Sequence, residues 1–265
     1  MPQTLERAAG TLKATIKGSE NRIGKLYQEG SSRLFFPESF SKTKECVVIN
    51  TAGGITGGDK FESSIEATEG SSIVVTTQAS EKVYKSSHGS AEVETTFFAS
   101  KNSKLLWLPQ DTILFSESDL SRKIIIRIED TSELLAFDQI VLGRSAMGEN
   151  IQESNFHDMW KIYNGDRLIY FDQSGWENTA PLNCAGLKGI KSYASFYYVG
   201  SKAKYYEEKL KRMKQVFKNV DFGSSLRNGC LLVRMFGSEA KAIKDRSINL
   251  LREIWKLDIP NVWKL

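Results

Sequence analysis

The glycine-rich stretch INTAGGITGGDKFE, residues 49–62, is the segment whose residue types could bind an anion. A glycine loop holds phosphate when a helix begins directly from it, because the free N–H groups of the helix then face the anion. Here the loop leads into a strand-like run, and it lacks both a Walker lysine and the dinucleotide-binding spacing. We therefore expect a tight turn, in which glycine allows positive φ and close backbone approach, and keep a phosphate cradle as the less favoured alternative.

Ligands for a tightly held transition metal are scarce. Histidine occurs only at His88 and His157, without ligand-like spacing. Cys46, Cys184 and Cys230 lie far apart and form no Cys-x-x-Cys pair, which argues against a zinc or redox site. We expect buried free thiols in a reducing compartment.

The composition is that of a globular protein. The chain has 265 residues, 40% of them hydrophobic, and a formal net charge of +4, so charge gives no general case for binding nucleic acid. The first residues carry charges throughout and lack the apolar core of a signal peptide, and no stretch is apolar enough to span a bilayer. We expect a cytoplasmic protein that binds neither nucleic acid nor membrane.

The elements that would position any site are predicted from an internal repeat. Four segments begin with a polar residue, place two aliphatic residues at positions three and four, and end in glutamine; they are SSIVVTTQ (71–78), SKLLWLPQ (103–110), SELLAFDQ (132–139) and DRLIYFDQ (166–173). Each follows a strand-like run and a short polar turn, which predicts a hairpin. Recurrence at a period of about thirty residues favours units that stack on one another. We predict a mainly β fold of repeated hairpins in a β-superhelix-like or layered architecture.

The pattern changes near residue 200. Residues 201–218 and 238–257 carry apolar residues at helical spacing, and residues 228–237 have the pattern of a strand. We predict one domain over residues 1–265, with a β-rich repeat region at 1–200 and a helix-strand-helix subregion at 201–265.

Four motifs, in order, resemble those of the urease accessory protein family UreD, called UreH in some organisms. They are VVINTAGGITGGDKF (47–61), VTTQASEKVYKSS (75–87), LLWLPQDTILF (105–115) and VLGRSAMGE (141–149). The segments LYQEGSSRLFFP (26–37) and IPNVWKL (259–265) also resemble the ends of family members, so the similarity covers nearly the whole chain.

The resemblance implies a non-enzymatic factor that matures the nickel metallocentre of urease. Family members bind apo-urease and, through UreF, the GTPase UreG, and their fold is a predominantly β superhelix with helices near the C-terminus. A nickel route through the interior of UreD has been proposed in the family. The resemblance thus implies no permanently bound cofactor, with nickel present only in transit.

Three carboxylates inside the family motifs are candidates for lining such a route: Asp59, Asp138 and Glu149. Carboxylates and water hold nickel more weakly than imidazole or thiolate clusters, which suits an ion that must be released. The alternatives are that Asp59 caps its own turn and that Glu149 pairs with Arg144. Asp138 lies inside an otherwise apolar strand, where a buried carboxylate must be compensated.

The second motif could supply a polar wall of this path through Thr77, Gln78, Glu81, Lys82 and Tyr84. The alternative, favoured for any single residue, is a strand end with ordinary ladder and turn hydrogen bonds.

Arg144, between Gly143 and Gly148, is expected to anchor a loop carbonyl or a carboxylate.

Three hypotheses follow from these residues. The first is a urease maturation scaffold that conducts nickel. The second is a pure conformational adaptor of apo-urease that handles no metal. The third is an enzyme that uses Asp59 and Glu149 as an acid/base pair, although no nucleophile arrangement accompanies them.

Overall fold

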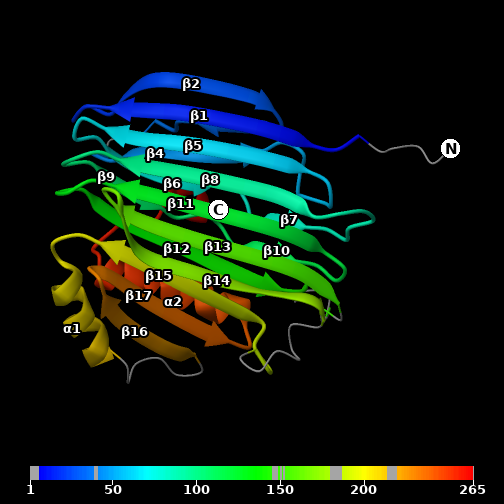
Figure 1. Cartoon of the computed structure of the whole chain (residues 1–265). Coiled ribbons are helices and arrows are strands. Elements are labelled where there is room, and N and C mark those ends of the chain that lie inside the picture. The colour runs from blue at the N-terminus through cyan, green and yellow to red at the C-terminus, as the bar shows by residue number, and fades with distance from the viewer. Residues whose placement is uncertain are drawn as a thin grey trace.

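Two β-sheets packed face to face form the body of the molecule in this computed structural model, which describes residues 6–38, 41–144, 149, 151, 153–179, 187–213 and 220–264 (Figure 1). The first sheet has the spatial order β14-β13-β11-β8-β5-β1-β2. The second has the order β16-β17-β15-β12-β9-β6-β4-β3, with β10 joined to β12 and to β7. The predicted mainly β, layered architecture is confirmed.

The first sheet consists of β1 (Ala9–Lys17), β2 (Arg22–Gly30), β5 (Lys60–Thr68), β8 (Ala91–Ala99), β11 (Asp119–Ile128), β13 (Ser154–Asn164) and β14 (Arg167–Thr179). The second consists of β3 (Ser32–Phe35), β4 (Lys44–Asn50), β6 (Ser72–Thr77), β7 (Glu81–Val83), β9 (Lys104–Trp107), β10 (Thr112–Leu114), β12 (Glu133–Leu142), β15 (Ser192–Val199), β16 (Asp221–Arg227) and β17 (Cys230–Gly237). The helices are α1 (Ala203–Met213), α2 (Ala240–Glu253) and a short 3-10 helix, Asn261–Lys264.

The middle of the chain winds between the two sheets, and each coil stacks on the one before. Lys60 pairs with Glu92 in the first sheet, and Ser72 pairs with Lys104 in the second. In both parallel pairings the two partners are separated by the same number of residues in the sequence, and this number equals the spacing between the first two repeat segments. The next coil pairs Ala91 with Leu120 in the first sheet and Lys104 with Glu133 in the second, by the offset between the second and third segments.

The repeated serines mark the same turn in each coil. The N–H of each serine donates to the carbonyl three residues earlier, and the residue before each serine has positive φ. The three serines are Ser71, Ser103 and Ser132, and the residues before them are Gly70, Asn102 and Thr131. The recurring polar turn therefore reflects one backbone conformation, in which the chain leaves one sheet for the other.

The predicted hairpins are wrong for the first three repeats. The strands that flank each turn belong to different sheets and pair in parallel with the neighbouring coil, so the unit is an arch. The fourth segment does form a hairpin, because β14 pairs antiparallel with β13 in the first sheet. It is therefore not a fourth coil. Turn chemistry alone does not determine whether a chain returns to its own sheet or crosses to the facing one.

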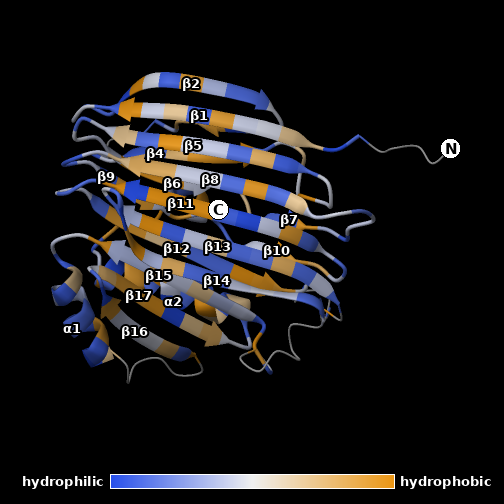
Figure 2. Ribbon diagram, viewed as in Figure 1, coloured by the Kyte–Doolittle hydropathy of each residue, from blue (hydrophilic) through white to orange (hydrophobic). Residues whose placement is uncertain are grey.

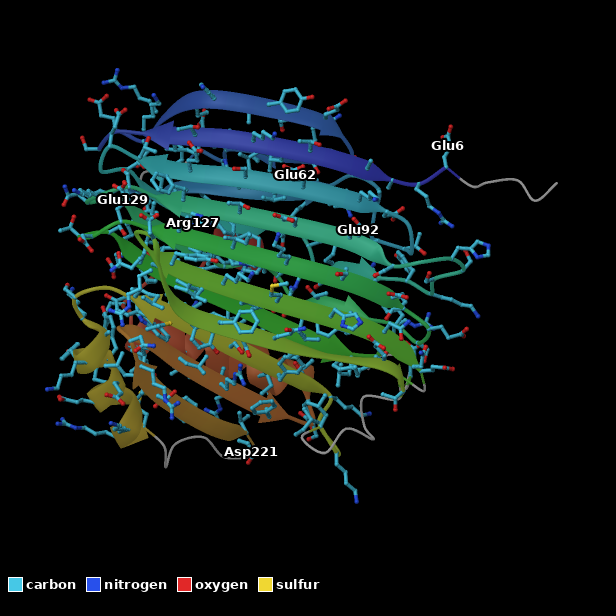
Figure 3. All side chains as sticks on the ribbon, in the orientation of Figure 1. Glu6, Glu62, Glu92, Arg127, Glu129 and Asp221 are labelled. Carbon is cyan, nitrogen blue, oxygen red and sulfur yellow. The ribbon has the colours of Figure 1, made fainter. Side chains whose placement is uncertain are left out.

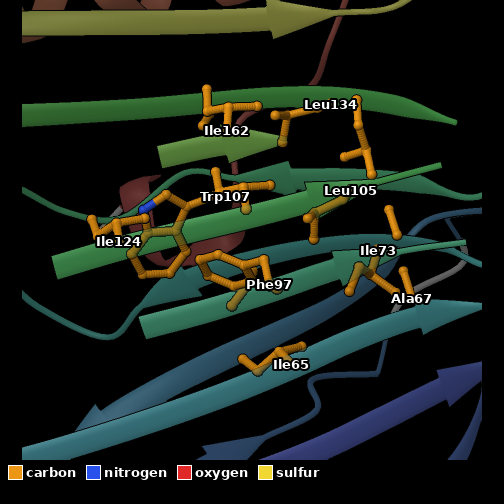
Figure 4. Close-up of a cluster of buried hydrophobic side chains, with 14 of the residues drawn as sticks. Ile65, Ala67, Ile73, Phe97, Leu105, Trp107, Ile124, Leu134 and Ile162 are labelled. Carbon is orange, nitrogen blue, oxygen red and sulfur yellow. The ribbon is translucent and has the colours of Figure 1, made fainter. Parts of the chain in front are cut away.

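The core has two main layers. Between the sheets lies a cluster that includes Ile65, Phe97, Trp107 and Ile162 (Figure 4). A second cluster fills the space between the other face of the second sheet and α1, α2 and the C-terminal segment. β12 is buried along nearly its whole length because both of its faces are covered. Hydropathy alternates along many of the other strands, as expected for strands with one buried face (Figure 2).

The C-terminal elements match the prediction with one addition. The helix predicted at 201–218 is α1, described to residue 213, and the helix predicted at 238–257 is α2. The strand predicted at 228–237 is β17, and β16 forms an antiparallel hairpin with it. In the described parts of the chain, no helix is long and apolar enough to cross a membrane.

Candidate functional site

The glycine-rich segment is a turn that enters a strand. It runs into β5, and no helix begins from it, so the phosphate-cradle alternative is wrong. Gly53 and Gly54 have φ of +79° and +144°. A Cβ on Gly54 would lie 2.3 Å from the Tyr84 ring and 2.8 Å from the carbonyl oxygen of Lys82. The glycines thus let the turn pack against β7 and the residues that follow it.

Asp59 stabilises this turn and the start of the first sheet. Its carboxylate accepts hydrogen bonds from the N–H of Thr56 at 2.8 Å and from the N–H of Ala8 at 2.9 Å. The Asp59 side chain is buried, and these two bonds satisfy one oxygen each. These contacts agree with the alternative that Asp59 caps its own turn.

Glu149 and Arg144 form the anchoring pair that the sequence offered as an alternative. The Arg144 Nε donates to Glu149 at 3.0 Å, and the Arg144 guanidinium lies over the Phe115 ring. The pKa of Glu149 is lowered, because its bonds with Arg144 and with the Ser116 N–H outweigh the effect of burial. Residues 145–148 of this motif, Gly148 included, lie outside the described residues. Because Glu149 binds Arg144 and Asp59 binds the N–H groups of Thr56 and Ala8, the structure does not join the two carboxylates as an acid/base pair.

Some side chains of the second motif face the interior and others face the surface. Thr77 and Glu81 line an interior cavity, described below, whereas Gln78 and Lys82 are exposed. Tyr84 is 39% exposed, donates to the Gly53 carbonyl at 3.3 Å and packs edge-on against Phe115. Two of the five predicted residues therefore face the interior space.

Asp138 lies in a buried ion cluster between the sheets. Arg122 on β11 donates to Asp138 of the facing sheet and to Asp158 on the neighbouring strand β13, and all three side chains are at least nine-tenths buried. The Trp160 indole N–H also donates to Asp158, at 3.1 Å. These three residues, Arg122, Asp138 and Asp158, are named here the Arg122 cluster.

With both carboxyl groups ionised, the formal charges of the cluster sum to one negative charge. Burial raises the pKa of Asp138, although the guanidinium of Arg122 opposes the shift. Burial would lower the pKa of Arg122, but the two carboxylates outweigh it and the pKa is raised. A buried charge is tolerated only when paired, and two carboxylates here share one cation.

Two cavities meet at this cluster. The larger, about 370 Å³, is lined by residues that include Asp138, Asp158, Asp172, Tyr193, Tyr197 and Arg234. The smaller, about 110 Å³, is lined by residues that include Asn50, Thr77, Glu81, Trp107, Arg122 and Asp138. Polar side chains thus line the cavities on both sides of the Arg122 cluster. Other charged side chains, such as Glu62, Glu92 and Arg127, stand on the outer face of the first sheet (Figure 3).

Each cavity holds a further carboxyl group. In the larger one, Asp172 forms an ion pair with Arg234 and accepts from the Tyr197 hydroxyl at 3.4 Å. In the smaller one, Glu81 accepts from the side-chain amide of Asn50 at 3.2 Å, and burial raises the pKa of Glu81 to about 7. The interior can therefore accept cations or protons on both sides of the cluster.

Arg122, Asp158, Asp172 and Arg234 were missed from the sequence. Arg122 occupies the inward row of β11 between Leu120 and Ile124, and Asp158 occupies that of β13 between Phe156 and Trp160. Asp138 was selected because it lies inside an otherwise apolar strand, whereas Arg122 and Asp158 stand out only once the inward row of their alternating strands is known.

No dedicated metal cluster occurs in the described part of the chain, where no group of three or more His, Cys, Asp or Glu side chains could hold an ion. Cys46 and Cys230 are buried free thiols, as predicted, and burial raises the pKa of each to about 12. Cys184 lies outside the described residues. His157 is half-exposed and lies 3.2 Å from Glu177.

Comparison with known proteins gives one consistent result. The family model described as UreD urease accessory protein matches residues 6–264. Urease accessory protein UreD of Rhizobium leguminosarum bv. trifolii is 37% identical over all of this chain and 97% of its own length. The protein of the same name from Agrobacterium fabrum is 36% identical over all of this chain and 94% of its own length. Urease accessory protein UreD 1 of Brucella abortus is 33% identical over 99% of this chain and 96% of its own length.

Proposed function

The chain belongs to the UreD family of urease accessory proteins, and from that premise we propose that it helps install nickel in urease by conducting the ion through its interior. A urease accessory role is shared by its relatives, which are named as accessory proteins and not as enzymes. We propose further that this chain links apo-urease to UreF, and through UreF to the GTPase UreG, and that it works in the cytoplasm.

One observation carries the nickel route: a buried cluster with excess negative charge stands where two polar cavities meet. Asp138 lines both cavities. An interior lined by carboxylates, hydroxyls and amides favours a cation, and oxygen ligands release nickel more readily than imidazole or thiolate does. Nickel is here the cargo and not a resident cofactor.

The three candidate carboxylates enter this proposal differently. We propose that Asp138 lies on the route, together with Asp158; both line the larger cavity, which supports this assignment. Asp59 and Glu149 line neither of the two cavities and are held by loop contacts. Their part in nickel transit stays a prediction, which Asp59→Ala and Glu149→Ala test in the co-expression described next.

The test is co-expression of urease subunits with the accessory proteins and either this chain or its Asp138→Asn variant. Asparagine keeps the shape and one acceptor of Asp138 and removes its charge. We expect the complexes to co-purify as before while the nickel content of urease falls. Glu94→Gln is the matched control, because Glu94 is a carboxylate on β8 whose side chain is 46% exposed and bound to Lys123.

The competing proposal is the conformational adaptor. It predicts unchanged nickel content with Asp138→Asn as long as the complex forms. Omission of the whole chain should lower nickel loading under both proposals. The Asp138 variant therefore decides between them.

A further inference from the structure

The two cavities share one lining residue, Asp138, which is bound by the guanidinium of Arg122. Asp158 lines the larger cavity and Arg122 the smaller one. The ion pairs of Arg122 thus join side chains of the two cavities, and an ion that crosses at Asp138 has to separate them.

All five N–H groups of Arg122 are engaged. Nε and Nη2 donate to Asp158 at 2.9 and 2.7 Å, and Nη1 and Nη2 both donate to Asp138. The fifth bond, from Nη1 to the Thr112 hydroxyl, is long at 3.4 Å. A guanidinium can bind two carboxylates at once in this way because its donors lie in a rigid plane. Arg122 thus occupies the positions that carboxylate oxygens would offer to a metal ion.

A divalent cation can compete for these positions. Two carboxylates and one guanidinium sum to one negative charge, so replacing the guanidinium by a divalent ion makes the immediate site neutral. Attraction between charges is strong in a buried site, where little water screens it. The exchange therefore replaces the two ion pairs of Arg122 by two ion pairs to a doubly charged cation.

The smaller cavity offers a place for the displaced guanidinium. Glu81 and Arg122 both line it, and among the described residues no basic side chain forms an ion pair with Glu81. The indole N–H of Trp107, a residue only 8% exposed, lines the same cavity without a hydrogen-bond partner in the described structure. On the other side, the buried Tyr193 hydroxyl lines the larger cavity near Ser174. The unpartnered indole N–H of Trp107 calls for water or a ligand in the smaller cavity.

We propose that Arg122 is a gate between the two cavities. At rest its guanidinium binds Asp138 and Asp158 and keeps the cavities separate. A divalent cation that reaches the carboxylates displaces the guanidinium into the smaller cavity, toward Glu81, and the guanidinium returns when the cation leaves. No covalent bond changes. The functional meaning of this gate rests on the proposed nickel route.

The alternative is that Arg122 is a fixed tie between the sheets. A gate lowers metal affinity, because the carboxylates are available only in the fraction of molecules whose guanidinium has moved away. A fixed tie that never yields excludes Ni²⁺ from the native carboxylates, so it predicts Ni²⁺ binding at the cluster only in the variants. Ni²⁺ binding that the native chain also shows, and that Asp138→Asn removes, therefore separates the gate from the tie.

The test uses the full-length chain as a fusion to a solubility partner without a histidine tag, titrated with Ni²⁺ and followed by calorimetry. Arg122→Lys keeps the positive charge but cannot bind both carboxylates as a planar fork. We expect its Ni²⁺ dissociation constant to fall by about tenfold relative to the unsubstituted chain. The double variant R122K/D138N should lose that gain, which locates the binding at the cluster.

A second pair of variants keeps the proposal testable should Arg122→Lys fail to fold. R122Q/D158N retains Asp138 alone and hence the same net charge as the native cluster, and it is compared with D158N, in which Arg122 still binds Asp138. We expect the double variant to bind Ni²⁺ about tenfold more tightly than D158N. Equal Ni²⁺ affinity within either pair of folded proteins would overturn the gate.

The outcomes also separate the gate from the nickel route. One outcome is that Arg122→Lys binds Ni²⁺ more tightly while co-expression with Asp138→Asn leaves the nickel content of urease unchanged. That outcome would support the exchange at Arg122 and contradict the nickel route. The opposite outcome is that Arg122→Lys binds Ni²⁺ as the native chain does while the co-expression gives urease with less nickel. That outcome would support the nickel route and contradict the gate.

Discussion

Arg122 and Asp158 are direct cross-strand partners in the parallel register of β11 and β13, and their side chains form a two-pronged ion pair between the sheets. Asp138 meets the same guanidinium from the second sheet. Arg122 thus binds one carboxylate that the register of its own sheet places beside it and one that comes from the facing sheet. Both the stability and the proposed function of the interior depend on it.

Removal of the guanidinium should strongly destabilise the fold. Arg122→Met leaves two buried carboxylates without their cation, which costs about 3–5 kcal/mol in comparable buried pairs. Urea unfolding of the full-length chain at pH 7 measures the loss. Lys123→Met is the matched control, because Lys123 is the next residue on β11 and its pair with Glu94 is largely exposed. The control should change stability by less than about 1 kcal/mol, and equal losses for both variants would contradict this account.

Substitution within the glycine turn should depend on position. Gly54→Ala places a methyl group against the Tyr84 ring and the Lys82 carbonyl at a φ of +144°, whereas a Cβ on Gly53 meets no atom within 4 Å. We expect Gly54→Ala to cost roughly 2 kcal/mol or more and Gly53→Ala, which is strained only by its positive φ, roughly 1 kcal/mol. Thermal and urea unfolding of the two variants give the comparison. A smaller loss for Gly54→Ala than for Gly53→Ala would show that the turn does not pack on Tyr84 as described.

The sequence predicts the stacking of this fold better than its connections. The offsets between the first three repeat segments reappear as the register of both sheets, because residues at one position of each coil become neighbours. The arches were missed because a polar turn between two β-rich runs is equally compatible with a hairpin. The fourth segment shared the residue pattern and yet pairs antiparallel.

The interior site could be predicted only in part. Asp138 stood out because its strand is apolar on both faces, and a lone carboxylate there requires a partner. Arg122 and Asp158 lie in alternating strands, where a charged residue is expected to face solvent until the inward row is known. Their pairing also depends on the register of β11 with β13, which joins residues far apart in the chain.

The carboxyl group of Glu81 should make stability depend on pH. Its pKa is about 7 in the folded protein against an ordinary value of 4.5, so the folded protein binds the extra proton between these values. The stability from this proton is fully present below pH 4.5 and is lost as the pH rises to about 7, by up to about 3 kcal/mol. Glu81→Gln should therefore be more stable than the native chain at pH 8 and similar to it near pH 4.5.

Urea unfolding at the two pH values measures this difference, with Glu94→Gln as the exposed control. The control should show no comparable gain at pH 8. A Glu81→Gln variant whose stability relative to the native chain is the same at both pH values would exclude a perturbed carboxyl group in the smaller cavity.

Asp59 gives the sharpest separation between a structural carboxylate and one that serves nickel. Asp59→Ala removes the acceptor for the Thr56 and Ala8 N–H groups, and the loss of two charge-assisted bonds should cost about 2–4 kcal/mol. The amide hydrogens of these two residues should then exchange faster with solvent, which hydrogen-exchange measurements detect. Because Asp59 lines neither cavity, urease nickel should fall only in proportion to the folded protein that remains. Native stability in Asp59→Ala together with lost nickel loading would instead move Asp59 onto the route.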